Sequence, residues 1–275
     1  MLKFEKYHGI GNDFIIFREE EVAGLDYSEL AMKVCHRNFG IGADGMMVAA
    51  KSEKADIRMI FYNADGSEAP MCGNGVRCFS HFVRNNKLVE KDLIAVETLA
   101  GNMLIKTEEK DGRYLARVNM GMPIFETDSI PMSVSEKDYI ERKIESYDRE
   151  FSISALFMGT THSVTFVDDL ETLDIYKYGR NLEINPIFPN KTNVNFAKAI
   201  SKDRVDVKTW ERGAGYTFAC GTGACAVVVI GNLTGRLDKN VEVAVPGGKL
   251  FIELTDDGVF MTGESQKIAE GHYFK

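Results

Sequence analysis

The sequence predicts an α/β (α+β) protein with two similar halves, each combining a mixed set of strands with one apolar helix. The pattern Cys-Gly-x-Gly occurs at residues 72–75 and again at 220–223, and small and apolar residues follow it both times. A polar turn begins nine residues before each pattern, and a glycine turn between two strands comes after it. An internal repeat of this length is too long for a solenoid, so we expect two halves that fold alike and face each other with pseudo-two-fold symmetry.

The first half alternates strand and helix patterns. From Tyr27 to about Asn38, apolar residues recur at helical spacing. A second helix should open at Cys72, with Val76 and Phe79 on its buried face. Phe82 and Val83 share that face. The strands are expected at 3–8, 14–17, 57–62, 93–98, 102–107 and 113–120.

The second half follows the same order. The segment 134–151 is polar and is predicted to be a solvated hairpin. Residues 156–167 should form a strand with a glycine turn inside it. Asp168 or Asp169 would then cap a helix that runs to Tyr178 and stops at Gly179. Further strands are expected at 193–196, 205–211, 241–245 and 249–254.

Composition and charge exclude several classes of protein. The chain has 275 residues and a net charge of −8, so it offers no basic stripe for nucleic acid. Its longest apolar run, 224–230, is too short to span a bilayer and predicts that the helix opening at Cys220 is buried on all sides. The first residues lack the apolar run of a signal peptide, so we expect a cytoplasmic protein without membrane partners. Five cysteines without Cys-x-x-Cys spacing predict free thiols and no metal site.

The two leading cysteines suit proton transfer. A helix N-terminus favours the thiolate, so Cys72 and Cys220 should have lowered pKa values. The glycines that follow leave backbone N–H groups bare, and these can hold a carboxylate. If the two sulfurs lay on opposite faces of one carbon, one thiolate could remove a proton while the other thiol delivered one. The pattern thus predicts inversion of an amino-acid Cα without a cofactor.

Other polar residues could complete such a site. His162 and Glu211 are candidates to set the proton inventory of the two thiols. Arg212 could clamp a second carboxylate with its guanidinium fork. Three asparagines in turns or at strand ends could read an amine or a carboxylate; they are Asn12, Asn63 and Asn193.

The chain resembles the diaminopimelate epimerases over nearly its whole length. The matching motifs are specific, and they lie at residues 8–14, 61–68, 72–78, 211–215 and 219–225. The resemblance implies two α/β halves, each a strand barrel around a central helix, with the C-terminal tail returning to the first half. We expect these halves to be 1–118 plus 266–275 and 119–265. It also implies an isomerase independent of pyridoxal phosphate that interconverts LL- and meso-diaminopimelate in lysine and peptidoglycan biosynthesis.

The same resemblance assigns roles to individual residues. Cys72 and Cys220 would be the catalytic base and acid, one for each direction, and His162 with Glu211 would modulate them. Backbone groups of two pairs would hold the reacting carboxylate; the pairs are Gly73 with Asn74 and Gly221 with Thr222. The rest of the substrate would be held by Asn12, Asn63, Asn193, Glu211 and Arg212.

One departure from the family bears on the substrate. Where the family usually has Gly-Asn-Pro-His, this chain has Gly159-Thr160-Thr161-His162, so Thr160 replaces an asparagine that helps bind the distal end of diaminopimelate. Epimerisation of another amino acid, such as histidine, lysine or lanthionine, therefore stays open. A thiol hydrolase or oxidoreductase and a non-catalytic binding protein on the same fold are further alternatives. The expected partner is a small amino-acid substrate, and the sequence leaves a homodimer open.

Overall fold

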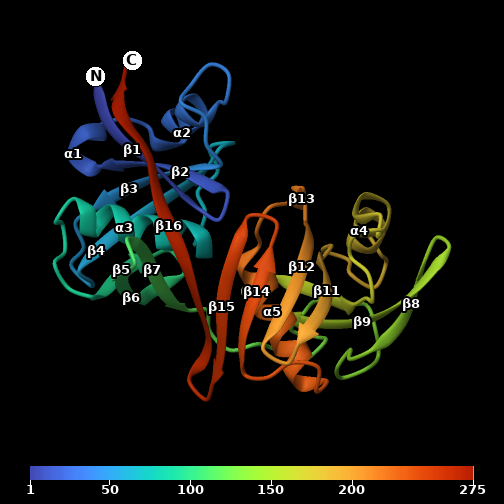
Figure 1. Ribbon diagram of the computed structural model, residues 1–275. Helices are drawn as coiled ribbons and strands as arrows, with labels where there is room; N and C mark the ends of the chain where they lie inside the picture. The colour runs from blue at the N-terminus through green and yellow to red at the C-terminus, as the bar shows by residue number, and fades with distance from the viewer. Residues whose placement is uncertain (275) are drawn as a thin grey trace. The chain divides into compact units, whose positions relative to one another are not determined.

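The computed structural model describes residues 1–274 and divides the chain into two compact units (Figure 1). The first unit comprises Met1–Asn119 with Thr262–Lys275, and the second comprises Met120–Met261. The helices are α1 (Glu19–Val22), α2 (Tyr27–Cys35), α3 (Gly73–Asn85), α4 (Ile175–Glu183) and α5 (Gly221–Leu233). The strands of the first unit are β1 (Leu2–Gly9), β2 (Asn12–Arg18), β3 (Gly45–Ala50), β4 (Ile57–Asn63), β5 (Leu93–Thr98), β6 (Gly101–Lys110) and β7 (Arg113–Asn119).

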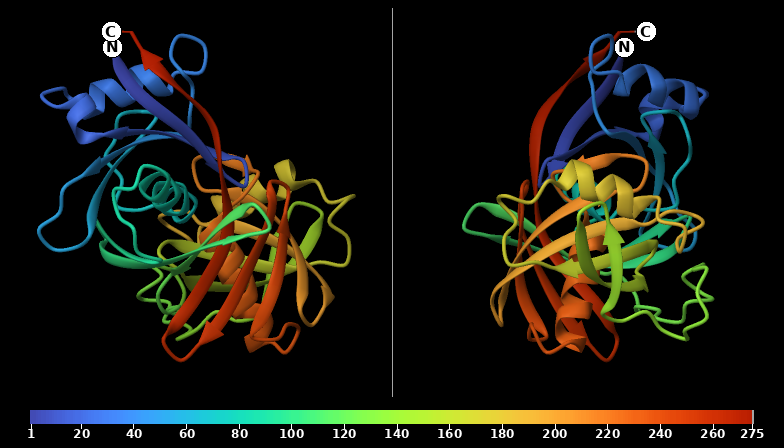
Figure 2. Two further views of the ribbon diagram at one scale, coloured as in Figure 1. Left: turned by 60° about the vertical axis from the view of Figure 1, so that its left-hand side comes forward. Right: turned by 90° about the vertical axis from the view of Figure 1, so that its right-hand side faces the viewer.

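The strands of the first unit close into a barrel around α3. Their order is β1 to β7 in sequence, then β16 (Gly258–Tyr273), which pairs antiparallel with β1 and so leaves no free edge. Helix α3 packs against β1, β2, β3, β6 and β7, and Figure 2 shows it encircled by these strands. Val76, Phe79, Phe82 and Val83 are buried, which confirms the predicted face. Arg77 is buried as well, which the apolar pattern did not predict.

The second unit surrounds α5 in the same way. Its strands are β8 (Arg142–Ser146), β9 (Arg149–Phe157), β10 (Thr161–Phe166), β11 (Asn193–Ser201), β12 (Arg204–Glu211), β13 (Gly215–Thr217), β14 (Asn240–Val245) and β15 (Gly248–Thr255). They run in the order β15-β14-β12-β11-β10-β9-β8, and β13 pairs with β12.

An irregular segment closes this second sheet. The Met120 N–H donates to the carbonyl of Val259, at the start of β16, over 2.8 Å. Ile124 exchanges two backbone hydrogen bonds with Phe157, at the end of β9. Helix α5 lies against β9, β10, β11, β12 and β15. Residues 224–230 are all buried, which confirms the prediction of a helix enclosed on every side.

One prediction for the second half was wrong, and another was only partly right. Helix α4 begins at its N-cap Asp174 rather than at Asp168 or Asp169, and it continues through Gly179 to Glu183. Gly179 does not stop the helix because it is the contact point with Trp210: an added Cβ would lie 2.7 Å from the Trp210 Cβ. The hairpin predicted in 134–151 is present as β8–β9, but it is not solvated throughout, since Ile144 and Phe151 belong to the core of the unit.

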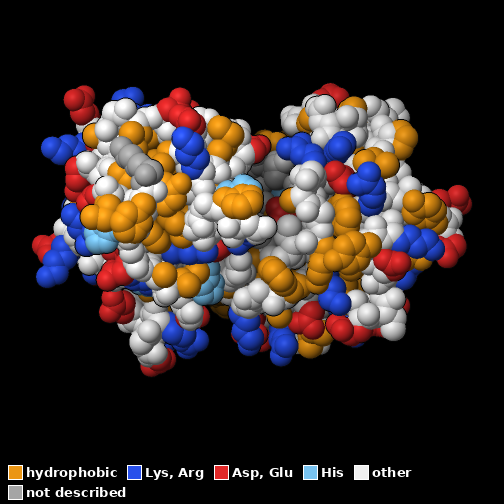
Figure 3. Space-filling model, turned by 90° about the horizontal axis from the view of Figure 1, so that it is seen from above, with side chains coloured by type: hydrophobic (Ala, Val, Ile, Leu, Met, Phe, Trp, Pro, Cys, Tyr) orange, Lys and Arg blue, Asp and Glu red, His pale blue; other side chains and the backbone are white. Residues whose placement is uncertain are grey.

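The surface carries charges of both signs. On the face shown in Figure 3, Lys and Arg side chains are interspersed with Asp and Glu. Within residues 1–274, no helix has the length and apolar character needed to cross a membrane.

Candidate active site

Cys72 and Cys220 occupy the same position in the two units, as N-caps of the central helices α3 and α5. Each has an extended backbone, and its carbonyl accepts the first helical hydrogen bond, from Val76 at 2.8 Å and from Ala224 at 2.9 Å. Neither thiol caps its own helix. The prediction that each cysteine opens a buried helix is therefore confirmed.

The second glycine of each pattern lets its helix pack closely against the surrounding sheet. A Cβ on Gly75 would lie 2.3 Å from Cε of Met47, and a Cβ on Gly223 would lie 2.3 Å from Oδ1 of Asn195. The first turn of each helix therefore presses directly against the surrounding sheet. A side chain at position 223 would displace the hydrogen-bonded Asn195 amide, whereas at position 75 the flexible end of Met47 can move aside.

In the first unit, Asn12 links Cys72 to an ionic cluster. The Cys72 thiol donates to Asn12 Oδ1 over 3.7 Å, and Asn74 Nδ2 donates to the same oxygen over 3.4 Å. On its other side, Asn12 Nδ2 donates to Asp44 Oδ2 over 2.5 Å. Because Asp44 accepts only, it fixes the amide with its oxygen toward the sulfur.

Pairs of opposite charge hold the ionic cluster together. Arg37 binds Asp44 over 2.6 Å and Asp13 over 2.9 Å, and Lys6 binds Asp13 over 2.8 Å. Burial acts to raise the pKa of Asp13, but the hydrogen bonds from Arg37 and Lys6 outweigh it and lower that pKa. The sequence analysis selected neither Asp44 nor Arg37, because their partners are distant in sequence. Asn63 lies beside this cluster, since Ala64 N–H donates to the Asp44 carbonyl over 3.2 Å.

In the second unit, Cys220 is buried and lies beside Glu211. Burial raises the pKa of the Cys220 thiol well above its ordinary value, and the negative charge of Glu211 raises it further. The expected lowering by the helix N-terminus is therefore wrong for Cys220, because desolvation and a neighbouring anion outweigh it. Glu211 is itself held by the Thr217 hydroxyl at 2.5 Å, and the Thr222 hydroxyl lies 3.5 Å from the sulfur. With its pKa raised, Cys220 is a neutral thiol near pH 7, a form that can donate a proton.

His162 is completely buried on β10. Burial lowers its pKa to about 3, with the charge of Arg212 adding to the effect, so the ring is neutral near pH 7. Its Nδ1 accepts from Asn195 Nδ2 over 3.1 Å. Sequence reasoning did not select Asn195, because a single asparagine inside a strand carries no local signal.

The distal-end candidates are joined by Asn193. Its Nδ2 donates to the Thr161 carbonyl over 3.0 Å and its Oδ1 accepts from the Arg212 N–H over 2.9 Å. Asn193 therefore ties the start of β10, next to Thr160, to the loop that carries Arg212. The Arg212 Nη1 donates to the Asn190 carbonyl over 3.1 Å.

A buried carboxylate that the sequence did not indicate supports this loop. Glu183 accepts from Trp210 Nε1 over 2.7 Å and from the Gly213 N–H over 3.1 Å. It therefore holds the residues on both sides of Glu211 and Arg212. Glu183 ends helix α4, where an acidic residue normally signals only solvent exposure.

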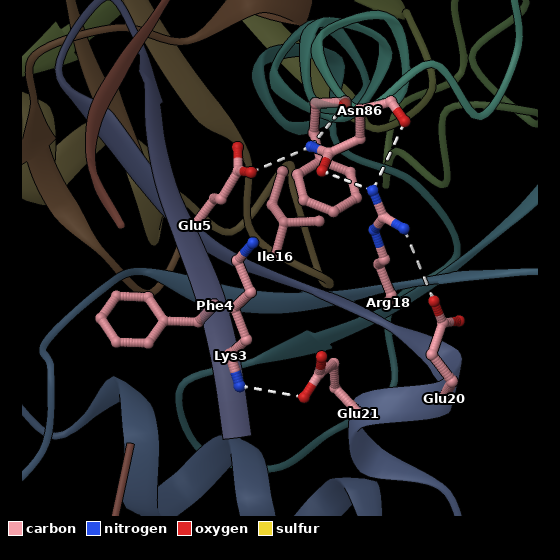
Figure 4. A pocket seen from close by; sticks show the side chains of 9 residues that line it. Lys3, Phe4, Glu5, Ile16, Arg18, Glu20, Glu21 and Asn86 are labelled. Atoms are coloured by element: carbon pink, nitrogen blue, oxygen red, sulfur yellow. Dashed lines mark hydrogen bonds and ion pairs between the residues drawn. The ribbon is translucent and has the colours of Figure 1, made fainter. Parts of the chain in front are cut away.

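A separate cavity of about 140 Å³ in the first unit contains none of these residues (Figure 4). Its polar groups pair with one another: Arg18 donates to Asn86 over 2.8 Å, and Asn86 donates to Glu5 over 3.0 Å. No group of three or more His, Cys, Asp or Glu side chains in residues 1–274 is arranged to hold a metal ion.

Solved structures define the class of the fold. The chain aligns over its full length with a PhzF-family phenazine biosynthesis protein from Bacillus anthracis (99% of that chain, TM-score 0.75, 16% identity). It aligns equally fully with a probable proline racemase from Agrobacterium radiobacter (93% of that chain, TM-score 0.71, 14% identity). A hydroxyproline epimerase from Agrobacterium vitis matches 98% of this chain and 91% of its own (TM-score 0.71, 15% identity). The protein thus has the two-unit fold shared by these racemases, epimerases and phenazine-biosynthesis proteins.

Sequence comparison defines the family within that class. The diaminopimelate epimerase family profile matches residues 4–126 and 154–268. The chain is 42% identical to a diaminopimelate epimerase from Halothermothrix orenii (98% of this chain, 97% of the relative). It is 44% identical to one from Carboxydothermus hydrogenoformans (99% of this chain, 100% of the relative). The chain belongs to the diaminopimelate epimerase family.

Proposed function

We propose that this protein is an amino-acid epimerase that interconverts LL- and meso-diaminopimelate, with Cys72 and Cys220 as the two proton-transfer groups. The observation that carries the proposal is the repeated half-site: in each unit a cysteine caps the N-terminus of the buried central helix. The identity of 42–44% to diaminopimelate epimerases supports the choice of substrate.

The reaction requires the two sulfurs to lie on opposite faces of one Cα. A thiolate takes the Cα proton and the carboxylate becomes an enediolate; the opposite thiol then protonates the other face. In one direction Cys220 is the acid, in keeping with the pKa raised by burial and by Glu211. The N–H groups at the starts of α3 and α5 would stabilise the developing charge, and one such donor is typically worth about 2.7–4 kcal/mol.

The remaining roles follow the half-sites. Gly73 with Asn74 and Gly221 with Thr222 offer N–H groups to the reacting carboxylate. Asn12, Asn63, Asn193, Glu211 and Arg212 would hold the rest of the substrate, with Thr160 beside its distal end. The reaction would supply lysine and peptidoglycan biosynthesis in the cytoplasm. The protein would act as a monomer or homodimer and bind neither nucleic acid nor membrane.

The proposal is tested by replacing each thiol. Cys72→Ser and Cys220→Ser should each lower the epimerisation rate of LL-diaminopimelate by several orders of magnitude, because a serine hydroxyl neither ionises nor donates as a thiol does. Deuterium incorporation at Cα in D₂O, followed by NMR, gives the rate, and Cys35→Ser is the matched control at a buried cysteine outside both helices. Full epimerisation by either active-site variant would contradict the two-thiol mechanism.

The substrate is decided by a rate panel. LL-diaminopimelate, lanthionine, L-lysine and L-histidine should be compared in D₂O at equal concentration. Thr160 offers one hydroxyl where an asparagine offers both a donor and an acceptor. The lost hydrogen bond should cost about 0.5–1.5 kcal/mol, so diaminopimelate should remain the best substrate. If an amino acid without a distal carboxylate reacts more than tenfold faster, the substrate assignment is wrong while the two-thiol mechanism stands.

A further inference from the structure

The two ring nitrogens of His162 have different environments. Nδ1 is engaged by Asn195 over 3.1 Å, whereas Nε2 is buried and has no hydrogen-bond partner within residues 1–274. Leaving a buried polar nitrogen unpaired is unfavourable, because it has lost its water without gaining a partner. The proton on His162 therefore decides whether this nitrogen offers a ligand a donor or an acceptor.

The orientation of Asn195 decides where that proton lies. Its Nδ2 donates to the Ser163 carbonyl over 2.9 Å, and its Oδ1 accepts from the Thr209 hydroxyl over 3.0 Å. A backbone carbonyl only accepts, so Nδ2 must face Ser163 and His162. Gly223 leaves room for this arrangement, since a Cβ there would lie 2.3 Å from Asn195 Oδ1.

The hydrogen bond from Asn195 makes Nδ1 an acceptor. The ring is neutral because burial and the charge of Arg212 lower its pKa to about 3. A neutral imidazole whose Nδ1 accepts carries its proton on Nε2. The unpaired atom is consequently an N–H donor. The positive charge of Arg212 acts on His162, so the Nε2–H group suits an anionic acceptor. The negative charge of Glu211 acts instead on Cys220.

We infer that Asn195 is a positioning residue that locks His162 as the neutral Nε2–H tautomer, so that His162 donates a hydrogen bond to a carboxylate oxygen of the amino-acid substrate. The tautomer is a property of the free protein and does not depend on a substrate. The identity of the ligand that accepts the hydrogen bond rests on the proposed function. In this role His162 binds the substrate and does not act as a base, because its only lone-pair nitrogen, Nδ1, already accepts from Asn195.

The lock can be observed without turnover. Long-range ¹H–¹⁵N spectra of protein labelled with ¹⁵N-histidine distinguish the protonated ring nitrogen from the bare one, and His162→Gln identifies the signals. The wild type at pH 7 should show the proton on Nε2. In Asn195→Asp the carboxylate should draw the proton to Nδ1 or hold the ring as imidazolium, and Asn195→Ala, which adds no charge, should show both tautomers. A wild-type ring protonated on Nδ1, or an Asn195→Ala ring unchanged from wild type, would overturn the lock.

A matched control lies on the same strand. Thr165 is buried, and its hydroxyl has no hydrogen-bond partner within the described chain, so Thr165→Val should leave the His162 spectrum and the kinetics unchanged. A shift of the His162 signals in this variant would mean that the tautomer responds to general packing rather than to Asn195.

Kinetics separate the lock from a structural role. A hydrogen bond to a charged group corresponds to about a tenfold or larger change in affinity. Asn195→Ala removes the lock but leaves part of the rings as the Nε2–H tautomer, so KM for LL-diaminopimelate should rise by less than this, about twofold if the two tautomers are equally populated, with a smaller change in kcat. Adding LL-diaminopimelate to the wild type should shift the His162 Nε2 signal. If the lock is seen but none of the four amino acids shifts the signal or exchanges in D₂O, the proposed function fails and the lock survives. If LL-diaminopimelate is epimerised without shifting the signal, the role of His162 as donor is wrong.

Discussion

At the scale of single residues, the two half-sites differ in how they control their thiols. Cys72 faces the amide oxygen of Asn12, which Asp44 and Arg37 hold in place. Cys220 lies beside Glu211, whose charge acts on the thiol directly. The repeat in the sequence is symmetric around the cysteines, but the polar groups that face them are not.

Removing the charge of Asp44 should release Asn12. In Asp44→Asn the Asn12 amide can rotate and present its NH₂ group to Cys72, where it would stabilise a thiolate. We expect the rate of Cys72 alkylation by iodoacetamide, followed by mass spectrometry, to rise severalfold at pH 7. Asp65→Asn, an exposed turn position in the same unit, is the matched control.

The route of this effect is tested in a second background. If Asp44 acts through the Asn12 amide, its effect on alkylation should vanish in Asn12→Ala. An equal effect in that background would mean that the Asp44 charge acts on the sulfur directly and that Asn12 has no part in it.

At the scale of elements, a helix could be predicted from the sequence only where the residues that determine it lie within the helix itself. Helices α3 and α5 were predicted from the Cys-Gly-x-Gly pattern and the apolar residues that follow it. The predicted end of the helix after Asp168 was wrong because Gly179 was taken as a stop signal. In the folded chain Gly179 packs against Trp210 on β12, which leaves no room for a larger side chain. Trp210 lies outside the local sequence pattern.

Gly179→Ala should therefore destabilise the protein although alanine favours helices. The added Cβ would lie 2.7 Å from the Trp210 Cβ, and the overpacking should cost about 1–3 kcal/mol in the free energy of unfolding. Urea denaturation measures the change, and Arg180→Ala, exposed on the same helix, is the control. A Gly179→Ala protein as stable as the wild type would show that α4 and β12 separate easily.

At the scale of the whole molecule, the half-buried His81 and the buried His162 should make the fold sensitive to acid. His81 packs flat against Tyr114, with ring centroids 4.0 Å apart, and burial lowers its pKa to about 4. The unfolded chain binds this proton near pH 6.5 and the folded chain only near pH 4, so stability rises with pH between those values and is lost as pH falls through them. His162 acts in the same direction.

The His81 contribution can be isolated. Between pH 7 and pH 5 the unfolding free energy of the wild type should fall by roughly 1–2 kcal/mol because of His81, and His81→Gln should remove that part of the fall. Urea denaturation at the two pH values gives the difference. His272→Gln, at an exposed position on β16, is the control. An unchanged pH dependence in His81→Gln would mean that His81 is protonated in the folded state.

The sequence by itself determined the repeat, the two buried helices and the cysteines that open them, because glycine patterns and apolar runs act through neighbouring residues. The tertiary structure alone decided the closure of the first barrel by β16, since that contact joins the two ends of the chain. It also decided the raised pKa of Cys220 and the neutral, oriented ring of His162. These properties arise from burial and from charges brought in by distant strands, and no local pattern encodes them.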